Sequence, residues 1–154
     1  MSKLKTTHFL KRMSFFGVII FVASVAQFYW SMGHLSESIS SACLECWFGE
    51  DVFYLSLINA LFLAFVFAVL PLKMNSILKI LLQFLLLIST WFFWNYSIFV
   101  ERESSWSTFL FDEEIQYVLH YSVLPILVLA FATLFFINDF RFLFAGLKGE
   151  AKRN

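Results

Sequence analysis

The sequence predicts an all-α membrane protein, a four-helix transmembrane bundle with both termini in the cytoplasm. Hydrophobic residues make up 60% of the 154 residues, and charged residues make up only 14%. An average soluble domain carries roughly 25% charged residues, so this chain cannot cover a mostly polar surface. Four stretches with at most one charge reach the ~20 residues that a helix needs to cross a bilayer. The same composition excludes an intrinsically disordered chain, which requires low hydrophobicity.

The four predicted spans lie within one domain, residues 1–154, and an interfacial tail follows the last of them. The spans cover residues 13–33, 52–70, 77–99 and 116–138, and the tail covers 139–154. Lys79 is the one charged residue inside a span, and near a helix end its long side chain can extend to the interface. Pro71 ends the second helix because proline cannot continue the hydrogen-bond ladder. Asp51 and Asp112 are predicted N-caps of the second and fourth helices.

The distribution of charge predicts the orientation. Ten of the eleven basic residues lie before the first span, between the second and third, or after the fourth. The opposite segments hold nine of the eleven acidic residues and a single basic one, Arg102. By the positive-inside rule the termini are cytoplasmic, and the two remaining loops face outward. Scattered over three segments and explained by topology, the basic residues give no support for nucleic-acid binding.

Polar residues within the spans are few, and no Asp or Glu lies in mid-membrane. A proton-coupled transporter or ion pump normally needs such a carboxylate, so these classes are disfavoured. The polar residues within the spans are Gln27, Asn59, Gln83, Ser89, Thr90, Asn95 and Ser122. The amides among them are predicted to form hydrogen bonds between helices, each contributing about 0.6 kcal/mol.

Aromatic residues gather in the outer half of the spans and in the outer loops. All five tryptophans and all five tyrosines lie there, as expected for a belt at the headgroup level. An aromatic pocket near the outer surface, able to hold a flat apolar cofactor such as a quinone, is the alternative. Trp91 favours the pocket, since it would lie about two helical turns below Phe99, deeper than a belt residue.

Cys43 and Cys46 form the one constellation with chemical potential, a Cys-x-x-Cys in the first outer loop. A structural disulfide is one interpretation, although a ring this small contributes only about 2 kcal/mol. A metal site completed by His34 and an acid is a second. A redox-active dithiol is the third. The helix dipole favours its thiolate, whereas Glu45, Glu50 and Asp51 oppose it by like charge.

The layout resembles the disulfide-bond formation protein B family. Four spans with cytoplasmic ends carry a Cys-x-x-Cys followed by aromatic residues at the outer start of the second helix, here Cys43, Cys46, Trp47 and Phe48. The resemblance implies an inner-membrane thiol-disulfide oxidoreductase in which Cys43 and Cys46 pass electrons to a bound ubiquinone or menaquinone. It also implies a periplasmic thioredoxin-like thiol oxidase as partner. Trp47, Phe48 and Trp91 are then the candidate quinone-binding residues.

Two features differ from that family. Its members carry a second cysteine pair in the other outer loop, whereas residues 100–115 contain none here. They also have an arginine shortly after the second cysteine, where this chain has Gly49 and Glu50. The alternative function is therefore a non-catalytic membrane protein. It would be either a small subunit of a membrane complex or a bacteriocin immunity protein that blocks a pore-forming toxin.

Overall fold

A computed structural model describes the backbone of residues 2–70 and 75–150 and the side chains of Thr7 and residues 9–70 and 75–138. Within these residues the chain is helical and has no strand. The long helices are α1 (Ser2–Met32), α2 (Phe48–Val69), α3 (Ser76–Arg102) and α4 (Phe111–Glu150), with short 3-10 helices η1 (Gly33–Leu35) and η2 (Ser104–Trp106). All four α-helices are long and apolar enough to cross a membrane. The predicted fold class, a four-helix bundle of a multi-pass membrane protein, is confirmed.

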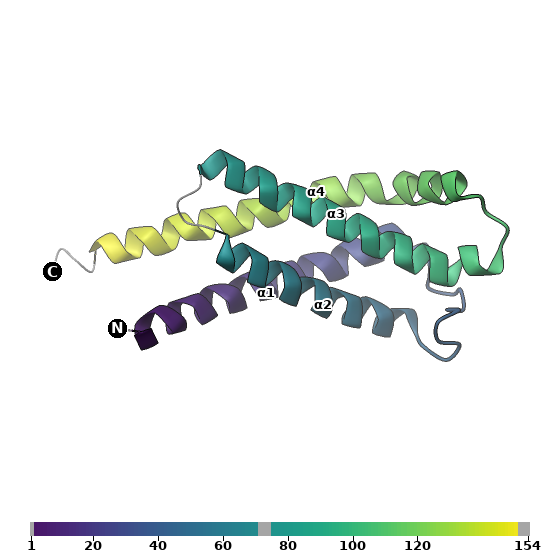
Figure 1. The fold of residues 1–154 in the computed structure, drawn as a ribbon, viewed down its shortest axis with the longest axis horizontal. Coiled ribbons are helices and arrows are strands. Elements are labelled where there is room, and N and C mark those ends of the chain that lie inside the picture. The colour runs from purple at the N-terminus through teal and green to yellow at the C-terminus, as the bar shows by residue number, and fades with distance from the viewer. Residues whose placement is uncertain (1, 71–74, 151–154) are drawn as a thin grey trace.

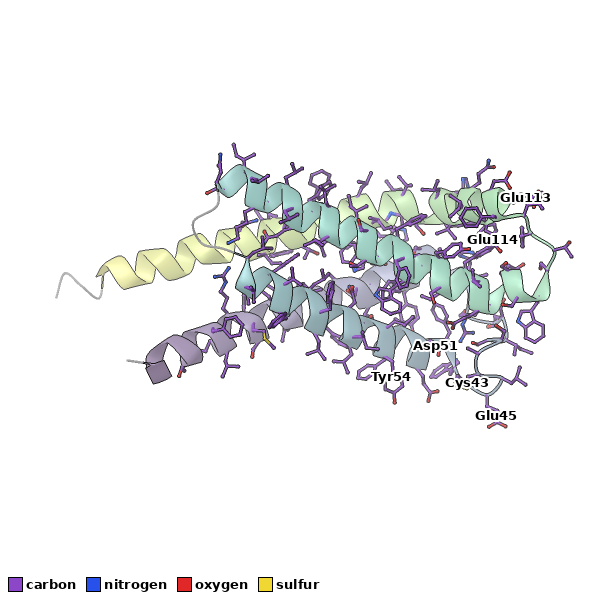
Figure 2. All side chains as sticks on the ribbon, viewed as in Figure 1. Cys43, Glu45, Asp51, Tyr54, Glu113 and Glu114 are labelled. Carbon is purple, nitrogen blue, oxygen red and sulfur yellow. A yellow bond between two sulfur atoms is a disulfide. The ribbon has the colours of Figure 1, made fainter. Side chains whose placement is uncertain are left out.

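The first residues of α1 and α3 and the last residues of α2 and α4 lie at one end of the bundle (Figure 1). We call this the terminal end. The loops over residues 33–47 and 103–110 lie at the opposite end, which we call the loop end. α1 contacts all three other helices, and α4 packs against both α1 and α3, whereas α2 and α3 contact each other little. Figure 2 shows labelled acidic residues at the loop end: Glu45 and Asp51 lie on the same side of it as Cys43, and Glu113 lies on the other side, at the start of α4.

The helices begin earlier than the predicted spans, and the predicted N-caps are wrong. α2 begins at Phe48, where the Glu50 carboxylate accepts a hydrogen bond from the Trp47 backbone N–H at 3.4 Å. α4 begins at Phe111. Asp51 and Asp112 therefore lie inside the first turn of their helices. Glu50 in α2 and Glu113 in α4 reach back instead, and each accepts a hydrogen bond from the backbone N–H of the residue before the helix, Trp47 and Leu110. The predicted stop at Pro71 lies outside the described residues.

The tail predicted over residues 139–154 begins as helix. α4 continues from the fourth predicted span to Glu150 without a break in its helical backbone. Residues 151–154 lie outside the described part of the chain. The sequence change from apolar to mixed residues after Asn138 therefore marks the end of the apolar span and not the end of the helix.

One face of α3 forms a seam along the interior of the bundle. Its buried residues recur mostly at intervals of four, which places them on one side of a helix. They are Lys79, Gln83, Leu87, Trp91, Asn95, Ile98, Phe99 and Arg102. Large apolar side chains on the other faces are exposed, for example Leu81 at 51% and Phe93 at 60%. Such residues suit a surface covered by lipid tails, whereas the seam is the face of α3 that packs against the other helices.

Hydrogen bonds between helices fix the middle of the bundle. The Ser24 hydroxyl of α1 accepts from Asn59 Nδ2 of α2 at 3.0 Å and from Trp91 Nε1 of α3 at 2.9 Å. Nearer the loop end, Asn95 bridges two other helices: its Oδ1 lies 3.0 Å from the Ser31 hydroxyl, and its Nδ2 donates to Ser122 at 3.0 Å. The predicted interhelical role is thus confirmed for the amides Asn59 and Asn95.

The two other amides predicted to bond between helices behave differently. Gln27 Nε2 donates to the Ser31 hydroxyl of its own helix at 3.1 Å. Gln83 is fully buried, yet neither of its amide atoms has a partner among the described residues. Spacing in the sequence places a polar side chain on a face, but whether a partner stands opposite depends on how the neighbouring helix is rotated.

Replacing Ser24 by alanine is expected to destabilise the bundle by about 1 kcal/mol, because it removes one acceptor shared by two buried donors. Ser56→Ala is the matched control. Ser56 is equally buried, but its hydroxyl has no partner among the described residues. Titration with SDS in mixed micelles measures both variants, and equal losses from the two would contradict the assigned role of Ser24.

Candidate functional site

The loop between α1 and α2 carries the cysteine pair at its far end. It leaves α1 through η1, where Leu35 is buried, and Ser40 is buried farther along. Cys43 and Cys46 form a disulfide with their Cα atoms 5.3 Å apart, and the Cys46 N–H donates to the Cys43 carbonyl at 3.2 Å. Both cysteines are partly exposed, while Leu44 between them is 69% exposed. The disulfide is therefore accessible to a molecule approaching the loop end.

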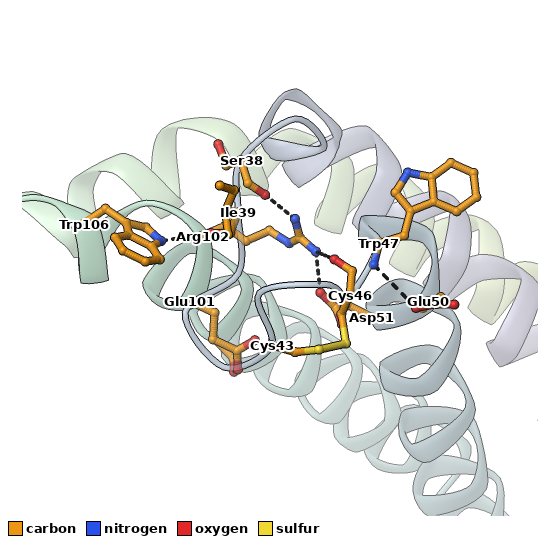
Figure 3. A network of polar contacts seen from close by, with 11 residues as sticks. Ser38, Ile39, Cys43, Cys46, Trp47, Glu50, Asp51, Glu101, Arg102 and Trp106 are labelled. Atoms are coloured by element: carbon orange, nitrogen blue, oxygen red, sulfur yellow. Dashed lines mark hydrogen bonds and ion pairs between the residues drawn. A yellow bond between two sulfur atoms is a disulfide. The ribbon is translucent and has the colours of Figure 1, made fainter.

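Arg102, at the end of α3, holds this loop in place (Figure 3). Its guanidinium donates to the Ser38 carbonyl and to the Cys46 carbonyl at 3.4 Å, and it pairs with Asp51 at 2.5 Å. It also lies over the Phe48 ring, 5.2 Å from the centroid. The Arg102 side chain is only 2% exposed. One buried cation thus ties together the loop, the disulfide turn and the first turn of α2.

Neighbours of Arg102 add two further ties to the same loop. The Ser41 N–H donates to the Glu101 carbonyl at 2.8 Å, and Trp106 Nε1 donates to the Ile39 carbonyl at 2.9 Å. The segment 101–106 therefore serves as a platform on which the cysteine loop rests. Because loops of this length are ordinarily mobile, these contacts are what fix the position of Cys43 and Cys46.

The charge environment of the pair differs from that expected from the loop's own sequence. Three acids, Glu45, Glu50 and Asp51, surround the cysteines along the chain, but Asp51 is paired with Arg102. Glu45 and Glu50 are exposed, so solvent screens them. The guanidinium is buried and bonded to the Cys46 carbonyl. Arg102 therefore removes the like-charge repulsion that Asp51, one of these three acids, would impose on a thiolate.

An open groove of about 440 Å³ begins at the residue after the disulfide. It is lined by Tyr29 of α1 and by residues from the start of α2, namely Trp47, Gly49, Glu50, Phe53 and Tyr54. A Cβ added to Gly49 would lie 3.0 Å from the Tyr29 hydroxyl, closer than ordinary contacts allow. Glycine thus permits Tyr29 to approach the α2 backbone. Arg102 does not line this groove; it borders a smaller one of about 280 Å³ with Ser38 and Trp106.

The structure places the three predicted quinone-binding residues in different environments. Trp47 is 75% exposed and lines the groove. Phe48 is 1% exposed. It packs edge-to-face against Tyr29, with ring centroids 5.3 Å apart, and the Arg102 guanidinium lies over its ring. Trp91 is fully buried in the bundle and donates to Ser24. Only Trp47 of the three reaches the groove, with Phe48 forming the layer beneath it.

His34 is directed away from the sulfur atoms and toward α4. Its ring stacks on Tyr121 with centroids 4.2 Å apart, and its Nε2 lies 3.0 Å from the Tyr117 hydroxyl. Among the described residues no three His, Cys, Asp or Glu side chains are grouped so that they could hold a metal ion. The interpretation of Cys43, Cys46 and His34 as a metal site therefore gains no support from the geometry.

Sequence reasoning missed Arg102 as part of this site. It is 56 residues from Cys46 along the chain, so no local motif connects them. The available signal was its isolation: it is the one basic residue among nine acids in the two loop-end segments. Compared with models of protein families, with curated proteins and with solved structures, the chain matches none.

Proposed function

We propose that the protein is a thiol-disulfide oxidoreductase of a bacterial inner membrane that passes electrons from Cys43 and Cys46 to a membrane quinone. The observation that carries the proposal is the accessible disulfide, held by a buried arginine beside an aromatic groove. A disulfide with a purely structural role requires neither exposure to solvent nor a neighbouring aromatic groove. Its contribution to stability would also be small, about 2 kcal/mol for a four-residue ring.

The groove has the character that a quinone ring requires. Trp47, Phe53 and Tyr54 offer aromatic faces for stacking. The Tyr29 and Tyr54 hydroxyls are hydrogen-bond donors, and the missing side chain of Gly49 leaves Tyr29 room at the α2 backbone. A quinone bound here supplies an acceptor for the two electrons and two protons that a dithiol loses when its disulfide forms. Arg102 supports the thiolate form of the pair by neutralising the nearby Asp51 carboxylate.

The single cysteine pair sets how electrons enter. The chain has only two cysteines, so no second pair can relay electrons from the donor. A thiolate of a reduced thioredoxin-like partner must therefore attack the Cys43–Cys46 disulfide directly. This attack forms a mixed disulfide between the partner and one cysteine of the pair, and releases the other cysteine as a thiolate. The partner's second thiolate then attacks the partner's sulfur in the mixed disulfide and releases the first cysteine. The partner leaves with a disulfide, and Cys43 and Cys46 are left reduced. Leu44 and Glu45, both exposed, lie where that partner would approach.

The proposed orientation places the loop end in the periplasm and the termini in the cytoplasm. Ten of the eleven basic residues belong to the N-terminal, middle and C-terminal segments of the sequence that the positive-inside rule assigns to the cytoplasm. The disulfide then lies in an oxidising compartment, where such bonds persist.

Thiol trapping in membranes tests the proposal. Because the chain has only two cysteines, alkylation reports this pair alone. We expect the pair to be mostly oxidised in quinone-containing membranes and mostly reduced after quinone depletion. Trp47→Ala should slow reoxidation, whereas Trp30→Ala, at another exposed tryptophan that does not line the groove, should leave it unchanged.

A redox state indifferent to quinone, together with full function in the Cys43→Ser, Cys46→Ser double variant, would exclude the oxidoreductase. That result would favour the non-catalytic class, a membrane-complex subunit or an immunity protein, in which the disulfide only shapes the loop.

A further inference from the structure

The terminal end of the bundle contains two cations whose side chains turn inward. Arg12 of α1 is half-buried, and Lys79 of α3 is only 6% exposed. The Lys79 side chain therefore runs along the bundle interior rather than across the outer face of α3. The two charges lie close enough to interact with each other. Like charges brought together inside a protein are unfavourable unless an anion lies between or beside them.

No such anion is present among the described residues. Arg12 Nη2 donates to the Phe67 carbonyl of α2 at 3.2 Å, and its guanidinium lies over the Phe16 ring at 5.2 Å. Its Nε is buried without a partner. Within the described side chains the one ion pair is that of Arg102 with Asp51, at the opposite end of the bundle. Neither inward-facing cation therefore has an anionic partner among the side chains that the structure describes.

Gln83 adds a neutral hydrogen-bonding group next to these cations. It lies one helical turn from Lys79 on the same face of α3. Its exposure is 0%, and both Nε2 and Oε1 lack partners among the described residues. Buried amides nearly always have partners. An amide without a partner, one helical turn from a buried lysine that has no described anion, indicates a site that is completed by a ligand carrying negative oxygen atoms.

We propose that Arg12, Lys79 and Gln83 bind a phosphate group, delivered either by the headgroup of an anionic lipid or by a soluble phosphate. Arginine and lysine donate charge-assisted hydrogen bonds to phosphate oxygens, and the Gln83 amide N–H₂ supplies a neutral donor. Basic sites between transmembrane helices near the membrane surface take lipid headgroups in this way. The site is independent of the cysteine pair.

Native mass spectrometry of the full-length protein in detergent tests the site, with phosphatidylglycerol as the lipid probe and inorganic phosphate as the soluble probe. We expect Arg12→Gln and Lys79→Gln each to weaken phosphatidylglycerol binding at least tenfold. Lys11→Gln is the matched control, because Lys11 is exposed beside Arg12 and its loss changes net charge equally. It should change binding less than twofold.

Gln83→Leu keeps the test decisive if a cation variant fails to fold. Leucine removes the unpaired amide, so the free protein should melt at the same temperature as the wild type or higher, while probe binding weakens severalfold. Inorganic phosphate that competes with phosphatidylglycerol would assign a soluble phosphate, and a lack of competition would assign the lipid. Equal binding of both probes to wild type, Lys79→Gln and Gln83→Leu would overturn the proposal.

Discussion

Trp91→Ala is expected to lower the free energy of unfolding by about 3 kcal/mol, the lower part of the range for large aromatic residues in cores. Trp91 is the largest fully buried side chain of the described residues, and its Nε1 donates to Ser24. In a bilayer the loss comes from the cavity and from lost van der Waals contacts, because lipid tails are as apolar as the core. SDS titration in mixed micelles measures it.

Two comparisons separate packing from cofactor binding at Trp91. Trp30→Ala, at a tryptophan that is 53% exposed, should cost less than about 1 kcal/mol. Trp91→Phe retains most of the ring volume and should leave the quinone-dependent oxidation of Cys43 and Cys46 unchanged. Slower oxidation in a stably folded Trp91→Phe variant would instead make Trp91 part of the quinone site.

Arg102→Met is expected to cost about 2 to 3 kcal/mol. Removing one partner of a buried ion pair typically costs about 3 to 5 kcal/mol, and the 22% exposure of the Asp51 side chain reduces the penalty. The carbonyls of Ser38 and Cys46 lose their donor as well. The cysteine loop should then separate from α3. In the wild type the Ser41 N–H donates to the Glu101 carbonyl, so hydrogen exchange at the Ser41 amide should become faster in the variant.

Arg102→Lys and a double-mutant cycle with Asp51→Asn are the controls. Lysine keeps the charge but lacks the planar fork that reaches several acceptors at once, so it should recover less than half of the lost stability. The Arg102→Met, Asp51→Asn double variant should be more stable than the sum of the two single losses predicts, because each single change leaves the remaining charge without its partner. Strict additivity would show that Arg102 and Asp51 do not act as a pair.

Much of the fold could be predicted from the sequence because lipid imposes strong constraints. A helix must satisfy its own backbone in the bilayer, so span length and charge placement were enough to predict four helices and a shared end for both termini. Helix starts were less predictable. Asp51 has the residue type of an N-cap, but Glu50 reaches the exposed N–H instead, and Asp51 pairs with Arg102.

The candidate site was predictable only in its local part. Cys43, Cys46 and Trp47 follow one another closely in the chain, so their proximity is covalent. Tyr29 and Arg102 join them from α1 and α3, and no sequence spacing indicates such a meeting. The same holds at the terminal end, where Lys79 was expected to extend to the interface and its side chain is instead buried along the α3 seam.

The sequence by itself determined that the chain is a bundle of four apolar helices with an acidic loop end that carries one cysteine pair. The effects of hydropathy and charge depend on the bilayer and on residues close by in the chain. They can therefore be inferred from the amino-acid composition and from the order of residues in the sequence. Only the tertiary structure decided which charges are paired: Arg102 is joined to the cysteine loop and Asp51, while Arg12 and Lys79 have no anion among the described side chains. Pairing depends on the rotation of each helix about its axis, which side-chain packing between helices sets.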